Sequence, residues 1–221
     1  MKNDSSVTVV KKTDDFVVTG DGKSPNWEEA DWVSLTIQEG ASDLTTRAKI
    51  LYSDKGIYFL FDCEDKKLTA TMTEDFSPLF KEDVVEVFLW PDQSVPLYFE
   101  YELSPLNYEW PILIPNINGR IAGWRPMRYE GDNKTQHATS VIGGSKVSHA
   151  SIKRWYAEFF IPYSLMSPLL PHRPKSGTRW RGNLYRIDYD NEYDTWTWQK
   201  TTKGIPGNFH EYEKFGTLLF E

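Results

Sequence analysis

The sequence predicts an all-β protein folded as an antiparallel β-sandwich with a few short helical turns. Two observations lead to this prediction. About ten segments with strand-like patterns follow one another at short spacing, with turn residues between them. No segment with a helical pattern is long enough to form a helix that connects two parallel strands. We therefore expect two antiparallel sheets packed face to face, and less than about 15% helix.

The first expected strands form a hairpin, in which residues 46–52 and 57–63 flank a turn at residues 54–56. Residues 83–90 form the next expected strand, which ends there because Pro91 follows. Residues 97–103 alternate, so that an apolar face with Phe99 and Tyr101 lies opposite an acidic face with Glu100 and Glu102. Further strands are expected at residues 137–142, 154–161, 179–190, 194–200 and 215–220.

The remaining segments are expected to be turns and loops. Residues 26–30 and 164–170 are expected to form short helical turns, and neither segment is long enough for a helix that could cover a sheet. Residues 107–133 are rich in Pro, Gly and Asn, which indicates long loops on one edge of the sandwich. We expect residues 15–221 to form a single domain, with residues 1–14 as an N-terminal extension or an edge strand.

Composition excludes several classes of function. The 221 residues include 25 Lys and Arg against 32 Asp and Glu, and the net charge of −7 repels polyphosphates, so nucleic acid is not an expected partner. One cysteine, Cys63, cannot form an internal disulfide, and its place on an apolar strand face indicates a buried structural thiol. No apolar run approaches the roughly 20 residues of a transmembrane helix, so no transmembrane segment is expected.

The usual catalytic and phosphate-binding motifs do not occur in the sequence. Carboxylates are nevertheless plentiful. A pair such as Glu86 and Glu100 could supply the acid and the base of a glycosidase, and this alternative stays open because sequence gives no distance between them.

An acidic run near the C-terminus is a candidate metal site. Residues 188–194 carry a carboxylate at every second position, which on an extended strand aims Asp188, Asp190, Glu192 and Asp194 to one side. Ca²⁺ takes six to eight oxygen ligands and suits such an array. We therefore expect Asp188, Asp190 and Glu192 to bind a structural calcium ion. The alternative, that the strand ends near Asp190 and the rest is a solvated loop, stays open.

Several short motifs occur in a fixed order from about residue 15 to the end of the chain. Residues 80–88 read Phe-Lys-Glu-Asp-Val-Val-Glu-Val-Phe, residues 157–162 read Ala-Glu-Phe-Phe-Ile-Pro, and residues 214–216 read Lys-Phe-Gly. In order and spacing they resemble the family 9 carbohydrate-binding modules and their stand-alone relatives. The resemblance implies a jelly-roll-like β-sandwich that binds glycans without cleaving them, often with structural calcium, in proteins that capture or degrade polysaccharide.

The resemblance also implies a ligand site. In sugar-binding members two tryptophans sandwich the terminal sugar, and this chain has Phe80 and Phe209 at those positions. The motif glutamate of the family matches Glu86. The site residues expected on this basis are Phe80, Glu86, Glu100, Glu102, Arg186, Asn208 and Phe209. We expect the two rings to form the walls, with Glu86 and Arg186 at the floor and Asn208 at the rim.

The matched positions differ from the family's in charge and in ring size. Glu100 and Glu102 stand where the family has Arg and Asn, and Arg186 stands where it has Gln, so its sugar preference is not transferred. Sugars stack their C–H faces on aromatic rings, and Phe offers less stacking area than Trp. We therefore expect weak glycan binding, with a Kd near the millimolar end.

The function expected from sequence is non-catalytic recognition of a glycan, at a chain end, with oligosaccharide or polysaccharide as partner. The alternatives are a sandwich domain that has lost sugar binding and serves a structural or protein-interaction role, and a glycoside hydrolase with paired carboxylates. The resemblance implies association with glycan-degrading enzymes and export to the periplasm or cell surface. We expect the signal peptide of such a precursor to be absent from this chain, because its start is polar.

Overall fold

The computed structural model of the chain describes residues 6–117, 120–127, 129–190, 192–202 and 208–221. Strands make up 45% of the described residues and short 3-10 turns 8%, so the prediction of an all-β fold is confirmed. Within the described residues, no helix is long and apolar enough to cross a membrane.

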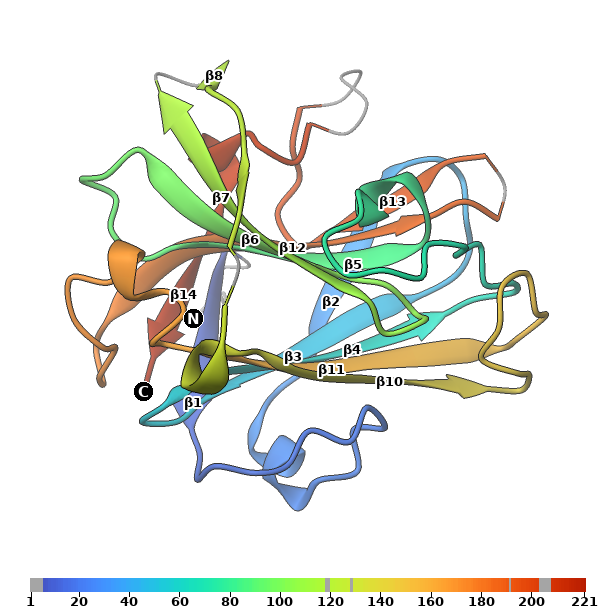
Figure 1. Cartoon of the computed structure of the whole chain (residues 1–221), viewed down its shortest axis with the longest axis horizontal. Helices are drawn as coiled ribbons and strands as arrows, with labels where there is room; N and C mark the ends of the chain where they lie inside the picture. The colour runs from blue at the N-terminus through green and yellow to red at the C-terminus, as the bar shows by residue number, and fades with distance from the viewer. Residues whose placement is uncertain (1–5, 118–119, 128, 191, 203–207) are drawn as a thin grey trace.

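The strands form two layers (Figure 1). The first layer, called the β5–β6 sheet, contains β5 (Val84–Trp90), β6 (Leu97–Leu103), β7 (Glu109–Ile117), β12 (Arg179–Asp188), β13 (Asp194–Thr197) and β14 (Gly216–Phe220). The second, called the β4–β11 sheet, contains β3 (Thr46–Tyr52), β4 (Gly56–Glu64), β10 (Gln136–Ile142) and β11 (Arg154–Pro162). All pairings within these two layers are antiparallel, as the sequence predicts.

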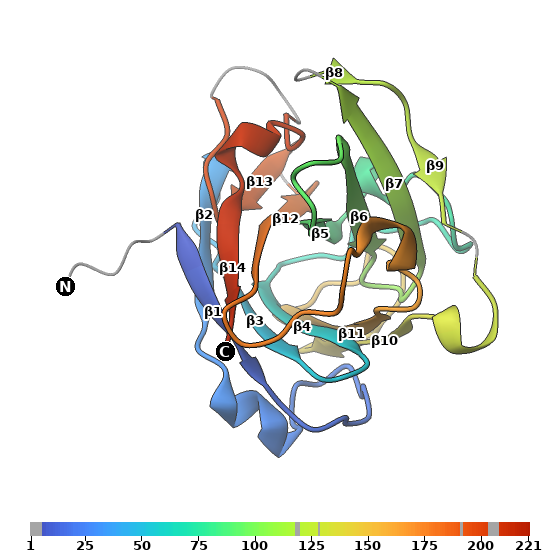
Figure 2. The same ribbon diagram turned by 90° about the vertical axis from the view of Figure 1, so that its left-hand side faces the viewer.

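Two strands join the layers at their flank. β1 (Val7–Lys12) runs parallel to both β14 and β3, and Figure 2 shows it beside β14. β2 (Val33–Glu39) pairs with β13 and with β3. Residues 7–12, expected as an extension or an edge strand, therefore have a strand on each side and close one flank of the sandwich.

Short elements complete the fold. β8 (Arg120–Ile121) and β9 (Arg125–Pro126) pair with β7. The 3-10 turns are η1 (Pro25–Glu29), η2 (Leu79–Lys81), η3 (Gly131–Asn133), η4 (Ser167–Leu169) and η5 (Tyr212–Lys214). The prediction that residues 107–133 are only loops is wrong, because β7 occupies much of this segment. β7 carries Pro111 and Pro115, and it tolerates them since, within the described residues, only the short β8 and β9 pair with its outer side.

Hydrophobic side chains form three clusters. The largest lies between the sheets and includes Phe59, Phe99, Tyr101 and Trp155, all fully buried. Cys63 belongs to this cluster, and burial raises the pKa of its thiol to about 12, as expected for a structural thiol. A second cluster covers the outer face of the β5–β6 sheet, and a third packs around Trp27 beside η1. An outer sheet face usually meets solvent, whereas segments outside the strands cover the apolar side chains of this one.

Candidate functional site

A cavity of about 440 Å³ opens on the outer face of the β5–β6 sheet. Three groups of side chains line it: the carboxylates Glu86, Glu100 and Glu102; the rings of Phe80, Trp110, Trp124, Tyr189, Tyr193, Phe209 and His210; and the aliphatic Ile112, Ile114, Ile121 and Ile187. Apolar walls with a few polar groups at the bottom are typical of a small-molecule site.

The three carboxylates share one face of two neighbouring antiparallel strands. Glu86 on β5 lies opposite Glu102 on β6, and Glu100 lies two residues before Glu102. The alternation of β6 puts Phe99 and Tyr101 into the core between the sheets, as predicted, and therefore turns both glutamates of β6 to the outer face. Glu86 is 2% exposed, Glu100 5% and Glu102 0%.

These carboxylates have few partners. The backbone N–H of Phe80 donates to Glu102 Oε2 at 3.0 Å. Glu102 Oε1 and Glu100 Oε2 are buried without a hydrogen-bond partner. His210 Nδ1 lies 3.9 Å from Glu100 Oε2, too far for a hydrogen bond. Buried acceptors without donors are costly, so these oxygens need either protons that the carboxyl groups share or a ligand that brings donors.

Burial controls the ionisation of this site. It raises the pKa of Glu100 to about 7, and it raises the pKa values of Glu86 and Glu102 well above the ordinary range, with the neighbouring carboxylates as further causes. Burial also lowers the pKa of His210 to about 4, so this imidazole is neutral at pH 7. At neutral pH the pocket therefore holds carboxyl groups that share protons, and His210 supplies no positive charge to them.

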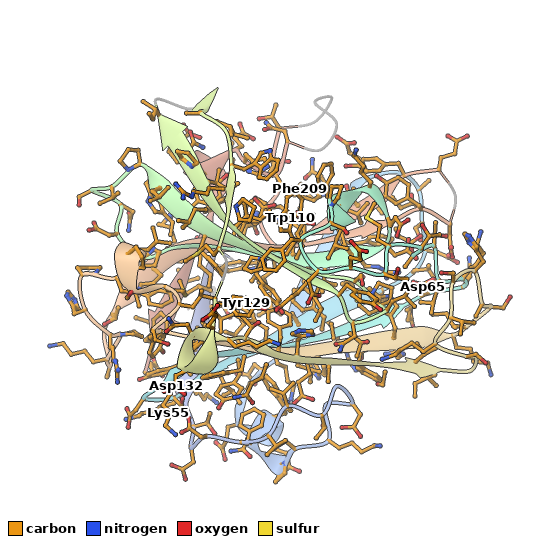
Figure 3. The ribbon with its side chains drawn as sticks, in the orientation of Figure 1. Lys55, Asp65, Trp110, Tyr129, Asp132 and Phe209 are labelled. Atoms are coloured by element: carbon orange, nitrogen blue, oxygen red, sulfur yellow. The ribbon has the colours of Figure 1, made fainter. Side chains whose placement is uncertain are left out.

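The aromatic walls come from four segments outside the strands and from β7. Phe80 is 41% exposed and stacks beside Trp110, with ring centroids 6.1 Å apart and planes at 17°. Trp124 is 60% exposed and meets Trp110 edge-on at 5.2 Å. Phe209 is only 4% exposed, because one face of its ring stacks on Tyr185 at 4.1 Å. Figure 3 shows Phe209 and Trp110 close together at the top of the β5–β6 sheet.

Five of the seven expected ligand-binding residues line this cavity: Phe80, Glu86, Glu100, Glu102 and Phe209. They come from η2, β5, β6 and the segment before β14. Asn208 directly precedes Phe209 and is half-buried, but it is not among the lining residues.

The prediction that Arg186 lies at the floor of the cavity is wrong. Tyr185 on β12 lies opposite Glu86, so Tyr185 faces outward and Arg186, the next residue, faces the core between the sheets. There its guanidinium is fully buried and donates to Asp65 at 3.0 Å and to Asp188 at 2.6 Å. It also lies 4.7 Å over the ring of Trp196. Arg186 is therefore part of a buried ion-pair network on the opposite face of the sheet.

Sequence reasoning did not include Tyr189 in this site, and it gave the aromatic loops around Trp110 and Trp124 only as the second place to look for the ligand. Trp110 lies opposite Glu102, on β7, which the Pro- and Asn-rich composition concealed. The signal that could have found it is the acidic face of residues 98–102, because a neighbouring strand must place side chains over the same face.

The acidic run at residues 188–194 does not form the expected linear array. β12 ends at Asp188, whose carboxylate accepts from Arg186, and Glu192 is exposed with a backbone φ of 92°. The predicted set of Asp188, Asp190 and Glu192 therefore does not converge. Among the described residues, oxygens of Asp65, Asp83 and Asp190 all lie within 4.8 Å of one another. Asp190 is the one member of this group that belongs to the predicted set of Asp188, Asp190 and Glu192, and Asp65 lies in the carboxylate-rich segment at residues 62–65, which the sequence also indicates for a cation.

The Asp65–Asp83–Asp190 group is a candidate site for a divalent cation. Burial raises the pKa of Asp65 to about 7 and that of Asp83 well above its ordinary range, where the charges of Asp65 and Asp188 add to the effect. Asp190 Oδ2 is buried and has no hydrogen-bond partner. Oxygen ligands with one free acceptor suit Ca²⁺, although Arg186 already contacts Asp65 from the core side.

The fold and the cavity define the class of this protein as a β-sandwich module with an aromatic, carboxylate-floored pocket on one sheet face. Residues 18–111 match the family model described as carbohydrate family 9 binding domain-like. This segment contains Phe80, Glu86, Glu100 and Glu102, so the resemblance indicated by the motifs is confirmed over this part of the chain.

Solved structures extend the likeness in fold to the whole chain. A protein from Bacteroides uniformis, provisionally described as carbohydrate-binding, superimposes with a TM-score of 0.77 at 17% identity, over 97% of this chain and 99% of that one. A family 9 carbohydrate-binding module from Caldicellulosiruptor kristjanssonii, in complex with cellotriose, gives a TM-score of 0.68 at 14% identity, over 97% and 93%. The glucose complex described for the same organism gives 0.68 at 15%, over 97% and 95%. No curated protein matches the sequence.

Proposed function

We propose that this protein binds carbohydrate in the cavity of the β5–β6 sheet and does not cleave it. The observation that carries the proposal is the cavity itself, where exposed ring faces stand above buried carboxylates whose oxygens lack donors. Rings accept the C–H faces of a sugar, and carboxylates accept its hydroxyl protons. Two structures of the same fold carry cellotriose and glucose, which supports the same ligand class here.

The depth of the carboxylates favours the end of a glycan over its middle. Glu102 is fully buried, so a sugar must enter the cavity to reach its free oxygen. A terminal sugar is linked to one neighbour only, so its free side can enter the cavity. An internal sugar is linked on both sides, and its two neighbours keep it out of the cavity. We therefore propose recognition of a chain end, with binding near the millimolar range because Phe80 offers less stacking area than Trp.

Titration calorimetry against a panel of neutral oligosaccharides tests this function. We expect binding with a Kd near 1 mM, equivalent to about 4 kcal/mol, and loss of detectable binding in Phe80→Ala. Trp32→Ala is the matched control, since Trp32 is a partly buried ring that packs on the Trp27 cluster, away from the cavity. Absence of binding to every sugar would reject the function, and release of reducing ends from polysaccharide would show a glycosidase instead.

We further propose that Asp65, Asp83 and Asp190 hold a structural calcium ion, which would neutralise their charges and connect the ends of three chain segments. The free Oδ2 of Asp190 and the spacing of the three carboxylates support this proposal. An ion that binds only the folded state raises its stability. EDTA is expected to lower the melting temperature, and added Ca²⁺ is expected to restore it; an unchanged melting curve, with no calcium by elemental analysis, would contradict the proposal.

The same resemblance supports a proposed setting outside the cytoplasm, beside enzymes that degrade glycans. Fractionation of the native cells tests it: the protein is expected with the periplasmic or surface fraction, and recovery in the cytoplasm would contradict it.

A further inference from the structure

The cavity has many hydrogen-bond acceptors and few donors. Glu86, Glu100 and Glu102 together present six carboxyl oxygens, and Glu100 Oε2 and Glu102 Oε1 have no donor beyond the protons that these carboxyl groups share. On the donor side, Trp110 Nε1 is buried without a partner, while the hydroxyl of Tyr189 already donates to the Phe80 carbonyl at 3.1 Å. When the carboxyl groups are ionised, their oxygens outnumber the donors of the lining Trp, Tyr and His side chains, so the cavity then favours a ligand with more donors than acceptors.

The cavity also lacks a positive charge of its own. None of the described lining residues is Lys or Arg, and His210 is neutral because burial holds its pKa at about 4. Arg186 faces the other side of the sheet, as shown above. Lys81 is exposed and lies outside the lining, 5.9 Å over the Phe80 ring. Any ionised carboxylate at the floor is thus uncompensated until a cation enters.

A bare metal ion does not suit this floor. Among the described residues, the spacing that metal ligands need occurs at Asp65, Asp83 and Asp190, and the three pocket glutamates do not meet it. The walls, moreover, are aromatic rings, which attract an organic cation through the negative face of the ring. Both observations favour a positive charge carried on an organic ligand that fits within the cavity of about 440 Å³.

We propose that the preferred ligand is a sugar with a free primary ammonium group, that is, a hexosamine without an N-acetyl group, at the end of a glycan. This inference rests on the proposed carbohydrate function and names the class of sugar. The sugar ring stacks at the Phe80 side of the cavity. Its ammonium group takes the place of the protons that Glu100 and Glu102 share and donates to the carboxylates so formed, with Glu86 adjacent.

The ammonium group matches the site better than the alternatives at the same sugar position. It has three donors, no acceptor and a positive charge, whereas a hydroxyl has one donor and an N-acetyl group has one donor, one acceptor and no charge. Charge-assisted hydrogen bonds are about twice as strong as neutral ones. A carboxylate sugar would add a further negative charge to the floor and is expected to be rejected.

Calorimetric titration of the wild-type chain at about pH 7 with glucosamine, glucose, N-acetylglucosamine and glucuronate tests the proposal. Glucosamine is expected to bind at least tenfold more tightly than glucose, and the other two no better than glucose. Added salt is expected to weaken glucosamine binding and to leave glucose binding unchanged, because only the first involves a charge pair.

Variants of the pocket glutamates test which carboxylates cause the preference for glucosamine over glucose. In Glu100→Gln and in Glu102→Gln, the ratio of the glucose Kd to the glucosamine Kd is expected to fall toward one. Glu28→Gln removes a charge from the exposed η1 turn and is expected to leave the ratio unchanged. A ratio that stays high in both pocket variants would overturn the assignment of the ammonium group to these carboxylates.

The outcomes separate this inference from the proposed function. If glucose and glucosamine bind equally well, the inference is wrong and the carbohydrate function stands. If no sugar binds, both are wrong. Choline, a cation without a sugar ring, is the last control: competition as strong as that of glucosamine would show a site for organic cations rather than for amino sugars.

Discussion

Replacing Glu100 with Gln is expected to stabilise the protein above neutral pH and to leave its stability in mild acid unchanged. The pKa of Glu100 is raised from 4.5 to about 7, with burial as the main cause. Each pKa unit is worth about 1.4 kcal/mol, so the ionised carboxylate destabilises the fold by about 3 kcal/mol. Gln has nearly the same shape and carries no charge, so it removes this cost.

The sign of the effect follows from proton binding. Between about pH 4.5 and pH 7 the folded state holds a proton on Glu100 that the unfolded state has released, so stability falls as pH rises through this window. At about pH 4.5 and below, the carboxyl group is mostly neutral in the folded state, and the variant and the wild type are expected to be similar. Above about pH 7 the difference reaches its full value.

Thermal and urea unfolding at about pH 4.5 and pH 8, followed by tryptophan fluorescence, measures the effect. A gain of about 3 kcal/mol corresponds to a rise in melting temperature of about 6–12 °C for a chain of this size. Glu28→Gln, in the exposed η1 turn, controls for the change in net charge. An equal difference between variant and wild type at both pH values would refute the reasoning, since it would show that ionisation of Glu100 does not oppose folding.

Three further predictions concern packing, the ion-pair network and the calcium site. Phe209→Ala is expected to lose about 3–5 kcal/mol of stability because the ring is buried on Tyr185. Phe80→Ala is expected to change the stability by less than about 1 kcal/mol. Equal losses in chemical denaturation would show that both rings belong to the hydrophobic core. Arg186→Met leaves two buried aspartates without their partner and is expected to cost about 3–5 kcal/mol, so a wild-type unfolding midpoint would contradict the network. Asp190→Asn is expected to abolish the effect of EDTA on the melting temperature, and a retained EDTA shift would place the ion elsewhere.

Sequence predicted much of the floor and walls of the site. The alternation of residues 97–103 assigned Glu100 and Glu102 to one face because a strand has a side-chain period of two. Motif spacing placed Phe80 and Phe209 at the same cavity as Glu86, and the structure brings all of these residues together. These features depend on local pattern and on order along the chain, which a sequence contains directly.

The errors concern relations between segments. Arg186 was assigned to the floor from its matched position, but the register of β12 against β5 sets Tyr185, not Arg186, beside Glu86. A shift of one residue reverses the face of every side chain in a strand, and no local pattern fixes the register between strands so far apart in sequence.

By itself the sequence determined that the chain forms strands rather than helices, which strand faces are apolar, and that acidic and aromatic residues occur together in its motifs. Only the tertiary structure decided which of these faces meet. It brought Trp110 from a Pro-rich segment beside Glu102, and it gathered Asp65, Asp83 and Asp190 from three distant segments. The physical reason is that period and composition are local properties, whereas burial, and with it the pKa of Glu100, depends on every segment that covers the site.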